Sequence, residues 1–91
     1  MFTIVSYDIT SDRRRVKIAN ILKDYGERVQ YSVFECIIDN EILERMVKRL
    51  LKTIDGGEDS LRIYKLCKDC KKKIDVYGTA HVTEDKEVYI V

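Results

Sequence analysis

The sequence has no proline, no tryptophan and only one histidine. It also has no apolar run near the roughly 20 residues that a helix needs to cross a bilayer, which argues against a membrane partner. The first ten residues, MFTIVSYDIT, contain no basic segment and no small-residue cleavage site, so they do not resemble a signal peptide. We therefore expect a cytoplasmic protein in which Cys36, Cys67 and Cys70 are reduced thiols.

Net charge is also nearly absent, because 17 basic residues are balanced by 16 acidic ones. Charge alone therefore does not indicate a nucleic-acid-binding protein, and the positions of the charges must decide. The chain is 45% hydrophobic and 36% charged, which is typical of globular proteins. Without an internal repeat or a long linker, residues 1–91 are predicted to form a single domain. A domain this small buries a modest share of its surface, so pairing with a second copy would help its stability.

The first part of the chain predicts a strand followed by a helix. Residues 2–7 form a continuous apolar and β-branched run, which suits a central strand covered on both faces. Residues 10–12 offer capping oxygens for a helix that starts near Arg13. Gly26 follows this helix as a natural C-terminal stop.

The rest of the chain contains further strand patterns around a second helix. Residues 28–39 have a strand pattern whose alternation changes phase; a bulge or bend near residues 32–34 would explain this, and so would a strand buried on both faces. The cleanest amphipathic helix pattern covers residues 41–54. Residues 61–66 and 74–77 are predicted to form strands.

Residues 87–91 complete the set of elements as a short final strand. The predicted fold class is α+β, in the order βαββαβ followed by this extra strand. Split βαβ units of this kind usually form a ferredoxin-like sheet with both helices on one face. The other face would lack a helix to cover it, and an apolar sheet face left in water is unstable. We therefore predict a homodimer packed through the sheet faces.

Three consecutive arginines, Arg13, Arg14 and Arg15, occupy the first turn of the predicted helix. The helix macrodipole disfavours cations at that position. A phosphate docked there would resolve the conflict, because backbone N–H groups and guanidinium groups both bind it. The alternative is a solvated run of charge that pairs with acidic side chains elsewhere. The local charge conflict favours the phosphate interpretation.

Asp8 lies where the first predicted strand ends. Rigid strand ends are suitable positions for metal-binding and catalytic carboxylates, although Asp8 could simply open the turn. Mg²⁺ takes about six oxygen ligands, usually one or two carboxylates with water and phosphate, so a single Asp holds it weakly. A two-fold axis that brought two copies of Asp8 together would meet this requirement.

Two separated motifs carry a resemblance to a known family. The first is YDI at residues 7–9 with Asp12 and Arg14-Arg15, and the second is YGERVQYSVFEC at residues 25–36. Further matches are RIY at 62–64, CKDC at 67–70, YG at 77–78 and the final hydrophobic strand. Over nearly its whole length the chain resembles the second core CRISPR-associated protein, the small dimeric partner of the spacer-integrating enzyme in CRISPR adaptation. Two motifs at the family's spacing are a strong signal.

The resemblance implies a ferredoxin-like homodimer whose last strand reaches the partner chain or the integrase. It also implies that Asp8 from each protomer lies near the two-fold axis and shares a Mg²⁺ ion. By motif, Asp8 is the metal ligand, and the candidate catalytic residues are Asp8, Tyr7, Arg15, Arg28 and Phe34. The candidate nucleic-acid-binding residues are Arg13, Arg14, Arg15 and Lys17, where Lys17 replaces an Arg of some family members.

Some of these residues also have ordinary structural explanations. Phe34 fits a plain core position, and Arg28 could cap a helix end or pair with an acidic neighbour. Cys67 and Cys70 have the C-x-x-C spacing of zinc and redox sites, but a closed zinc site needs four ligands. We expect a turn with buried thiols there, and a solvent-facing His81.

The resemblance supports two functions. In the first, a dimer binds DNA or RNA and scaffolds the spacer-integrating complex while the CRISPR adaptation integrase does the chemistry. In the second, paired Asp8 carboxylates and Mg²⁺ form an endonuclease that acts on single-stranded RNA or double-stranded DNA. A regulatory module for a small ligand would not need Arg13 to Arg15. We favour the scaffold, because each protomer offers one strand-end Asp and no well-placed His for acid–base catalysis.

Overall fold

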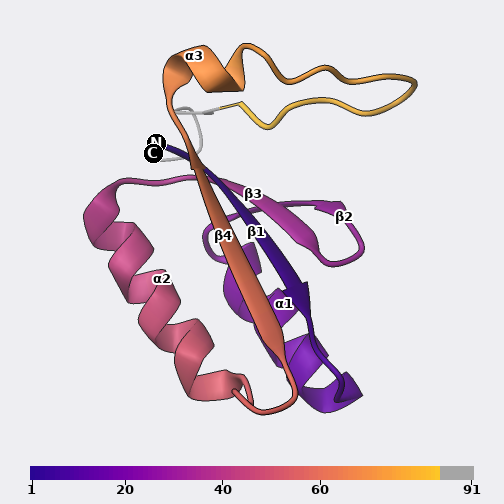
Figure 1. Cartoon of the computed structure of the whole chain (residues 1–91), viewed down its shortest axis with the longest axis vertical. Helices are drawn as coiled ribbons and strands as arrows, with labels where there is room; N and C mark the ends of the chain where they lie inside the picture. The colour runs from indigo at the N-terminus through magenta and orange to yellow at the C-terminus, as the bar shows by residue number, and fades with distance from the viewer. Residues whose placement is uncertain (85–91) are drawn as a thin grey trace.

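The computed structural model describes residues 1–84, and Figure 1 shows their path. The elements in chain order are β1 (Phe2–Asp8), α1 (Asp12–Lys23), β2 (Gly26–Gln30), β3 (Val33–Ile37), α2 (Asn40–Thr53), β4 (Ser60–Leu66) and α3 (Lys68–Lys71). The strands form one antiparallel sheet in the order β2-β3-β1-β4. This is the predicted ferredoxin-like βαββαβ arrangement. The extra strand predicted at residues 87–91 lies outside the described residues.

The long strand pattern at residues 28–39 belongs to a hairpin. β2 and β3 are joined by the two-residue turn Tyr31-Ser32, and their pairing shifts register between Arg28 and Gln30. The turn and the bulge together reverse the chain and change the phase of the side chains. The bend expected near residues 32–34 is therefore a complete turn one residue earlier.

Two other expectations are wrong. Residues 74–77 form no strand and follow α3 as irregular chain. Gly26 does not stop α1, because the helix ends at Lys23 with Asp24 as its cap. Gly26 instead opens β2, where an added Cβ would lie 2.2 Å from the carbonyl oxygen of Glu35. The glycine thus permits close approach of β2 to β3.

Both long helices begin at a capping side chain and pack on one face of the sheet. The Ser11 hydroxyl accepts a hydrogen bond from the Arg14 N–H in α1, and the Asp39 carboxylate accepts one from the Ile42 N–H in α2. Figure 1 shows α1 behind the strands and α2 beside them. The largest fully buried side chains are Phe34, Ile18, Leu22, Met46, Leu50, Val5, Thr3 and Cys36.

The opposite sheet face bears no long helix among residues 1–84, but part of the chain lies on it. After α3, the Thr83 N–H donates a hydrogen bond to the Glu35 carboxylate at 3.0 Å, and the Thr83 hydroxyl donates one to Glu27. At the end of the sheet the Lys71 ammonium lies 5.1 Å from the centre of the Phe2 ring. We call this side the helix-free face. None of the helices in the described part of the chain is long and apolar enough to cross a membrane.

Candidate nucleic-acid interface

A hollow of about 370 Å³ lies between α1 and the β2–β3 hairpin. Three of its lining residues are cations, Arg15, Lys23 and Arg28, and one is an acid, Asp12. Two tyrosines also line it, the buried Tyr7 and the exposed Tyr31. We call this site the basic hollow. Its excess of positive charge and its aromatic surface suit a nucleic-acid strand, whose phosphates attract cations and whose bases stack on rings.

The sheet fixes the floor of the basic hollow. The Tyr7 N–H donates to the Ser32 carbonyl at 3.1 Å, which ties the end of β1 to the hairpin turn. The Tyr7 ring stacks on Phe34 with centroids 6.4 Å apart, and the Arg28 guanidinium lies 5.4 Å from the centre of the same Phe34 ring. Phe34 is fully buried. It therefore supports Tyr7 and Arg28 from beneath and does not offer its ring to a ligand.

Arg15 is held in place at the edge of the hollow. Its guanidinium donates to the Ile9 carbonyl at 2.9 Å and forms an ion pair with Asp12. The hydrogen bond to Asp12 raises the pKa of Arg15, and desolvation opposes this effect. The side chain stays partly exposed, so Arg15 presents a fixed positive charge to the hollow.

Asp8 lies beside the basic hollow in a second, smaller depression. That depression measures about 200 Å³ and is also lined by Tyr7, Arg15, Tyr31 and Ser32. Asp8 is exposed at the last position of β1, opposite Ser60 of β4. Within residues 1–84 no three His, Cys, Asp or Glu side chains cluster as a metal site. One chain therefore brings a single carboxylate to this depression.

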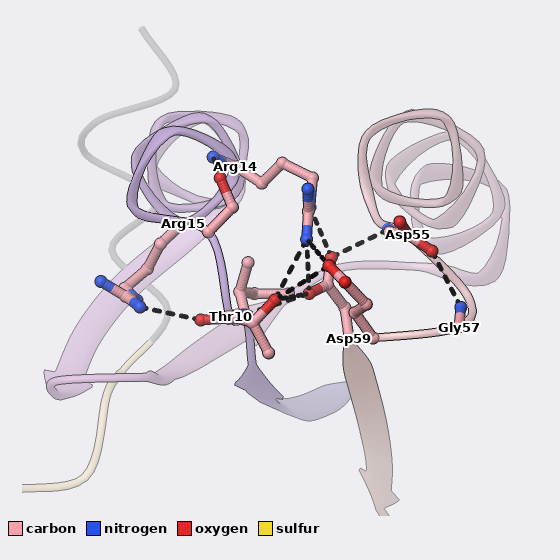
Figure 2. A network of polar contacts seen from close by, with 9 residues as sticks. Thr10, Arg14, Arg15, Asp55, Gly57 and Asp59 are labelled. Carbon is pink, nitrogen blue, oxygen red and sulfur yellow. Dashed lines mark hydrogen bonds and ion pairs between the residues drawn. The ribbon is translucent and has the colours of Figure 1, made fainter.

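Arg14 is engaged inside the molecule, as Figure 2 shows. Its guanidinium donates to the Asp59 carboxylate at 2.8 and 3.1 Å and to Glu58 at 3.1 Å. Asp59 also accepts hydrogen bonds from the N–H groups of Thr10 and Asp55. The Arg14 guanidinium, above all, holds the pKa of Asp59 well below its usual range. Arg14 thus joins the start of α1 to the loop before β4. This is the alternative described for the arginine run, in which an arginine pairs with acidic side chains elsewhere in the chain.

Arg13 and Lys17 are differently placed. Both are exposed on α1, one helical turn apart, and neither forms an ion pair with a described residue. Residues four apart on a helix lie on the same face. These two cations are therefore accessible to an anionic ligand next to the basic hollow.

Tyr31 and Lys23 also line the hollow, although the sequence did not identify them as site residues. Tyr31 is 76% exposed at the tip of the hairpin, and its carbonyl lies 3.5 Å from the Tyr7 hydroxyl. Lys23 is the last residue of α1. The sequence could have identified Tyr31, because it is an aromatic residue in the middle of the motif at residues 25–36, which also contains Arg28 and Phe34.

The cysteine prediction is wrong in one respect. Cys67 and Cys70 are exposed, whereas buried thiols were expected. They lie at the start of the short helix α3, with Cys67 as its N-cap, and neither belongs to the hydrophobic core. The expectation for His81 is confirmed, since its side chain is 78% exposed, with its Nε2 4.0 Å from Glu27.

Comparisons with known proteins agree with this architecture. Residues 1–74 match the family model described as CRISPR associated protein Cas2. The chain is 44% identical to a protein of Chloroflexus aurantiacus named CRISPR-associated endoribonuclease Cas2 3, over 100% of this chain and 98% of that protein. It is 46% identical to CRISPR-associated endonuclease Cas2 2 of Thermus thermophilus, over 96% of this chain and 92% of that protein.

A solved structure extends the likeness to a larger assembly. A chain of a partial Cas6-RT-Cas1–Cas2 complex superposes with a TM-score of 0.66 at 30% identity, covering 82% of this chain and 88% of that one. The family model covers most of the sequence, and both curated relatives match across almost their full lengths. The chain therefore belongs to the CRISPR associated protein Cas2 family.

Proposed function

We propose that two copies of this chain bind nucleic acid and hold it for spacer insertion in CRISPR adaptation, with the integrase as partner. The basic hollow carries the proposal: Arg15, Lys23 and Arg28 surround one depression, and Tyr31 stands exposed at its rim. The related chain in the Cas1–Cas2 complex supports an integrase as the partner. The proposal places the protein in the cytoplasm, where its nucleic acid would be.

The cations of the hollow would bind the backbone, and Tyr31 would stack on a base or sugar. Arg15 is oriented by Asp12 and Ile9, so it loses little freedom when it meets a phosphate. Arg28 lies over the buried Phe34 ring and remains exposed. Arg13 and Lys17 would extend the contact along α1, whereas Arg14 serves the fold. Such binding should be strong at low salt and nearly independent of sequence.

The test is duplex binding by Arg28→Gln, measured at several salt concentrations. Each lost phosphate contact should reduce the slope of log K against log salt by about 0.9. Arg45→Gln is the matched control, because Arg45 lies exposed on α2, where it pairs with Glu41. We expect the slope of log K against log salt to be shallower for Arg28→Gln than for the wild type, and unchanged for Arg45→Gln. Equal slopes for both variants and the wild type would show that Arg28 of the basic hollow does not contact phosphate.

A second candidate function is metal-dependent cleavage of RNA or DNA. The observation that favours it is the exposed Asp8 carboxylate in the depression next to Arg15. One carboxylate fits Mg²⁺ only in part, and two copies of Asp8 with water and phosphate would complete the ligand set. The bound ion would supply charge stabilisation and an activated water. Arg15 would hold the phosphate beside it.

The variant Asp8→Asn separates the two functions. With Mg²⁺ present, nuclease activity should fall by orders of magnitude if Asp8 holds the metal, and EDTA should do the same to the wild type. Spacer insertion with the cognate integrase should persist if the protein acts as a scaffold. Asp75→Asn, which removes an exposed carboxylate elsewhere, controls for charge alone. Loss of insertion by Asp8→Asn, with the integrase complex intact, would contradict the scaffold.

A further inference from the structure

Cys67 and Cys70 lie next to each other on the surface, and no role proposed above uses them. The Cys70 N–H donates to the Cys67 sulfur, with 3.4 Å between nitrogen and sulfur. Because the N–Cα bond is about 1.5 Å, the Cα of Cys70 lies within about 5 Å of that sulfur. Both side chains are exposed. The two thiols are thus within reach of a disulfide after a rotation of the side chains.

The two thiols are chemically unequal. Hydrogen bonds from the Cys70 N–H and from the Cys70 thiol lower the pKa of Cys67. The same contact raises the pKa of Cys70, which gives its proton to the shared hydrogen bond. The largest cause of the lowered Cys67 pKa is the backbone N–H of Cys70. A thiolate is the reactive form of cysteine, so Cys67 is the nucleophile of the pair.

The third cysteine shows what an inert thiol looks like in this fold. Cys36 is completely buried in the sheet, and desolvation raises its pKa to about 11. A metal site is also poorly supplied, because no third His, Cys, Asp or Glu joins Cys67 and Cys70 within residues 1–84. A closed zinc site uses four such ligands. The exposed pair therefore fits thiol–disulfide chemistry better than metal binding.

We propose that Cys67 and Cys70 form a reversible dithiol–disulfide pair that reacts with small-molecule disulfides. The Cys67 thiolate attacks one sulfur of the small disulfide, breaks its S–S bond and releases one thiolate, which takes up a proton. Cys70 then loses its proton to solvent, attacks the Cys67 sulfur and displaces the second small thiol. The protein loses two electrons and two protons, and the disulfide becomes two thiols.

The position of the pair gives the reaction a structural consequence. Residues 67–70 connect β4 to the segment whose Thr83 binds Glu35 on the helix-free face. A disulfide closes a ring around the first turn of α3 and so fixes the junction from which that segment leaves the sheet.

The test uses the full chain, reduced and freed of reductant, and then exposed to glutathione disulfide with intact-mass analysis over time. Wild type and Cys36→Ser should lose two hydrogen atoms and carry no adduct. Cys70→Ser should stop at one glutathione adduct, because the resolving thiol is missing. Cys67→Ser should form its adduct more slowly than Cys70→Ser does, because Cys67 accepts the Cys70 N–H hydrogen bond that lowers its pKa, whereas Cys70 has a raised pKa.

Other results would overturn the proposal. Two glutathione adducts on the wild type would mean that Cys70 does not resolve the mixed disulfide. A wild type that forms only disulfide-linked dimers would exclude the internal disulfide. The same conclusion would follow if the wild type and Cys36→Ser both stayed reduced. Equal adduct rates in Cys67→Ser and Cys70→Ser would show that the two thiols are not differentiated. A circular dichroism spectrum for each variant establishes that the fold is retained.

Discussion

The substitution Thr3→Val should stabilise the protein. Thr3 is fully buried on the helix-facing side of β1, opposite Cys36, and its hydroxyl has no hydrogen-bond partner among the described residues. An unpaired buried hydroxyl costs about 1–3 kcal/mol. Valine has nearly the same shape, favours strands and removes the polar atom. We therefore expect a gain of about 1–2 kcal/mol in the free energy of unfolding.

Denaturant titrations at one fixed protein concentration measure this gain, because the stability of the proposed dimer would depend on concentration. The midpoint should rise with an unchanged m value, and the melting temperature should rise by about 4–8 °C per kcal/mol. Thr3→Ser is the matched control, since it keeps the hydroxyl and loses one methyl group, at a cost of about 1 kcal/mol. A lower midpoint for Thr3→Val, together with a neutral Thr3→Ser, would show that the hydroxyl is paired and refute the reasoning.

Three further predictions concern packing, pH and assembly. Gly26→Ala should cost about 1–3 kcal/mol by urea titration, because the new Cβ would collide with the backbone of Glu35 and Cys36; an unchanged midpoint would contradict it. The pKa of Asp59 is lower in the folded protein than in the unfolded chain, chiefly because of Arg14. Asp59 therefore stabilises the fold above pH about 4, and this stabilisation is lost as the pH falls and the folded carboxylate is protonated. Asp59→Asn should lower the urea midpoint at pH 7, and the midpoint of this variant should decrease less than that of the wild type as the pH is lowered. Equal midpoints and equal pH dependence would show that the network with Arg14 does not stabilise the fold. Sedimentation at micromolar concentration should report about twice the 10.7 kDa chain mass, whereas a stable folded monomer would exclude the dimer.

Periodic patterns predicted most of the fold correctly. The continuous apolar run of β1 and the helical repeat of α2 are local properties, so they can be read without knowing what lies across the molecule. The hairpin was harder, because the turn Tyr31-Ser32 lacks the Asn-Gly or Asp-Gly pair that usually marks such turns. Residues 74–77 include Ile74, Val76 and Tyr77 but form no strand, since β propensity depends on a neighbour to pair with.

The candidate site depended more on contacts between distant residues. The sequence placed three arginines at the start of α1, but only the structure shows that Arg14 pairs with Asp59, 45 residues away. It could not show that Phe34 lies beneath Arg28 and Tyr7, because burial follows from packing of the whole sheet. The positions of Arg15 and Arg28 around one hollow agree with the motif, and their roles stay predictions.

The exposed Tyr31 gives the protein a convenient optical property. The chain contains six tyrosines and no tryptophan, so its intrinsic fluorescence comes from phenol rings alone. Tyr31 stands 76% exposed on a turn that is anchored to β1 through the backbone of Ser32. A single indole introduced by Tyr31→Trp would therefore emit without background from other tryptophans, at the rim of the basic hollow. Its quenching by stacked bases would follow nucleic-acid occupancy in real time without an attached dye.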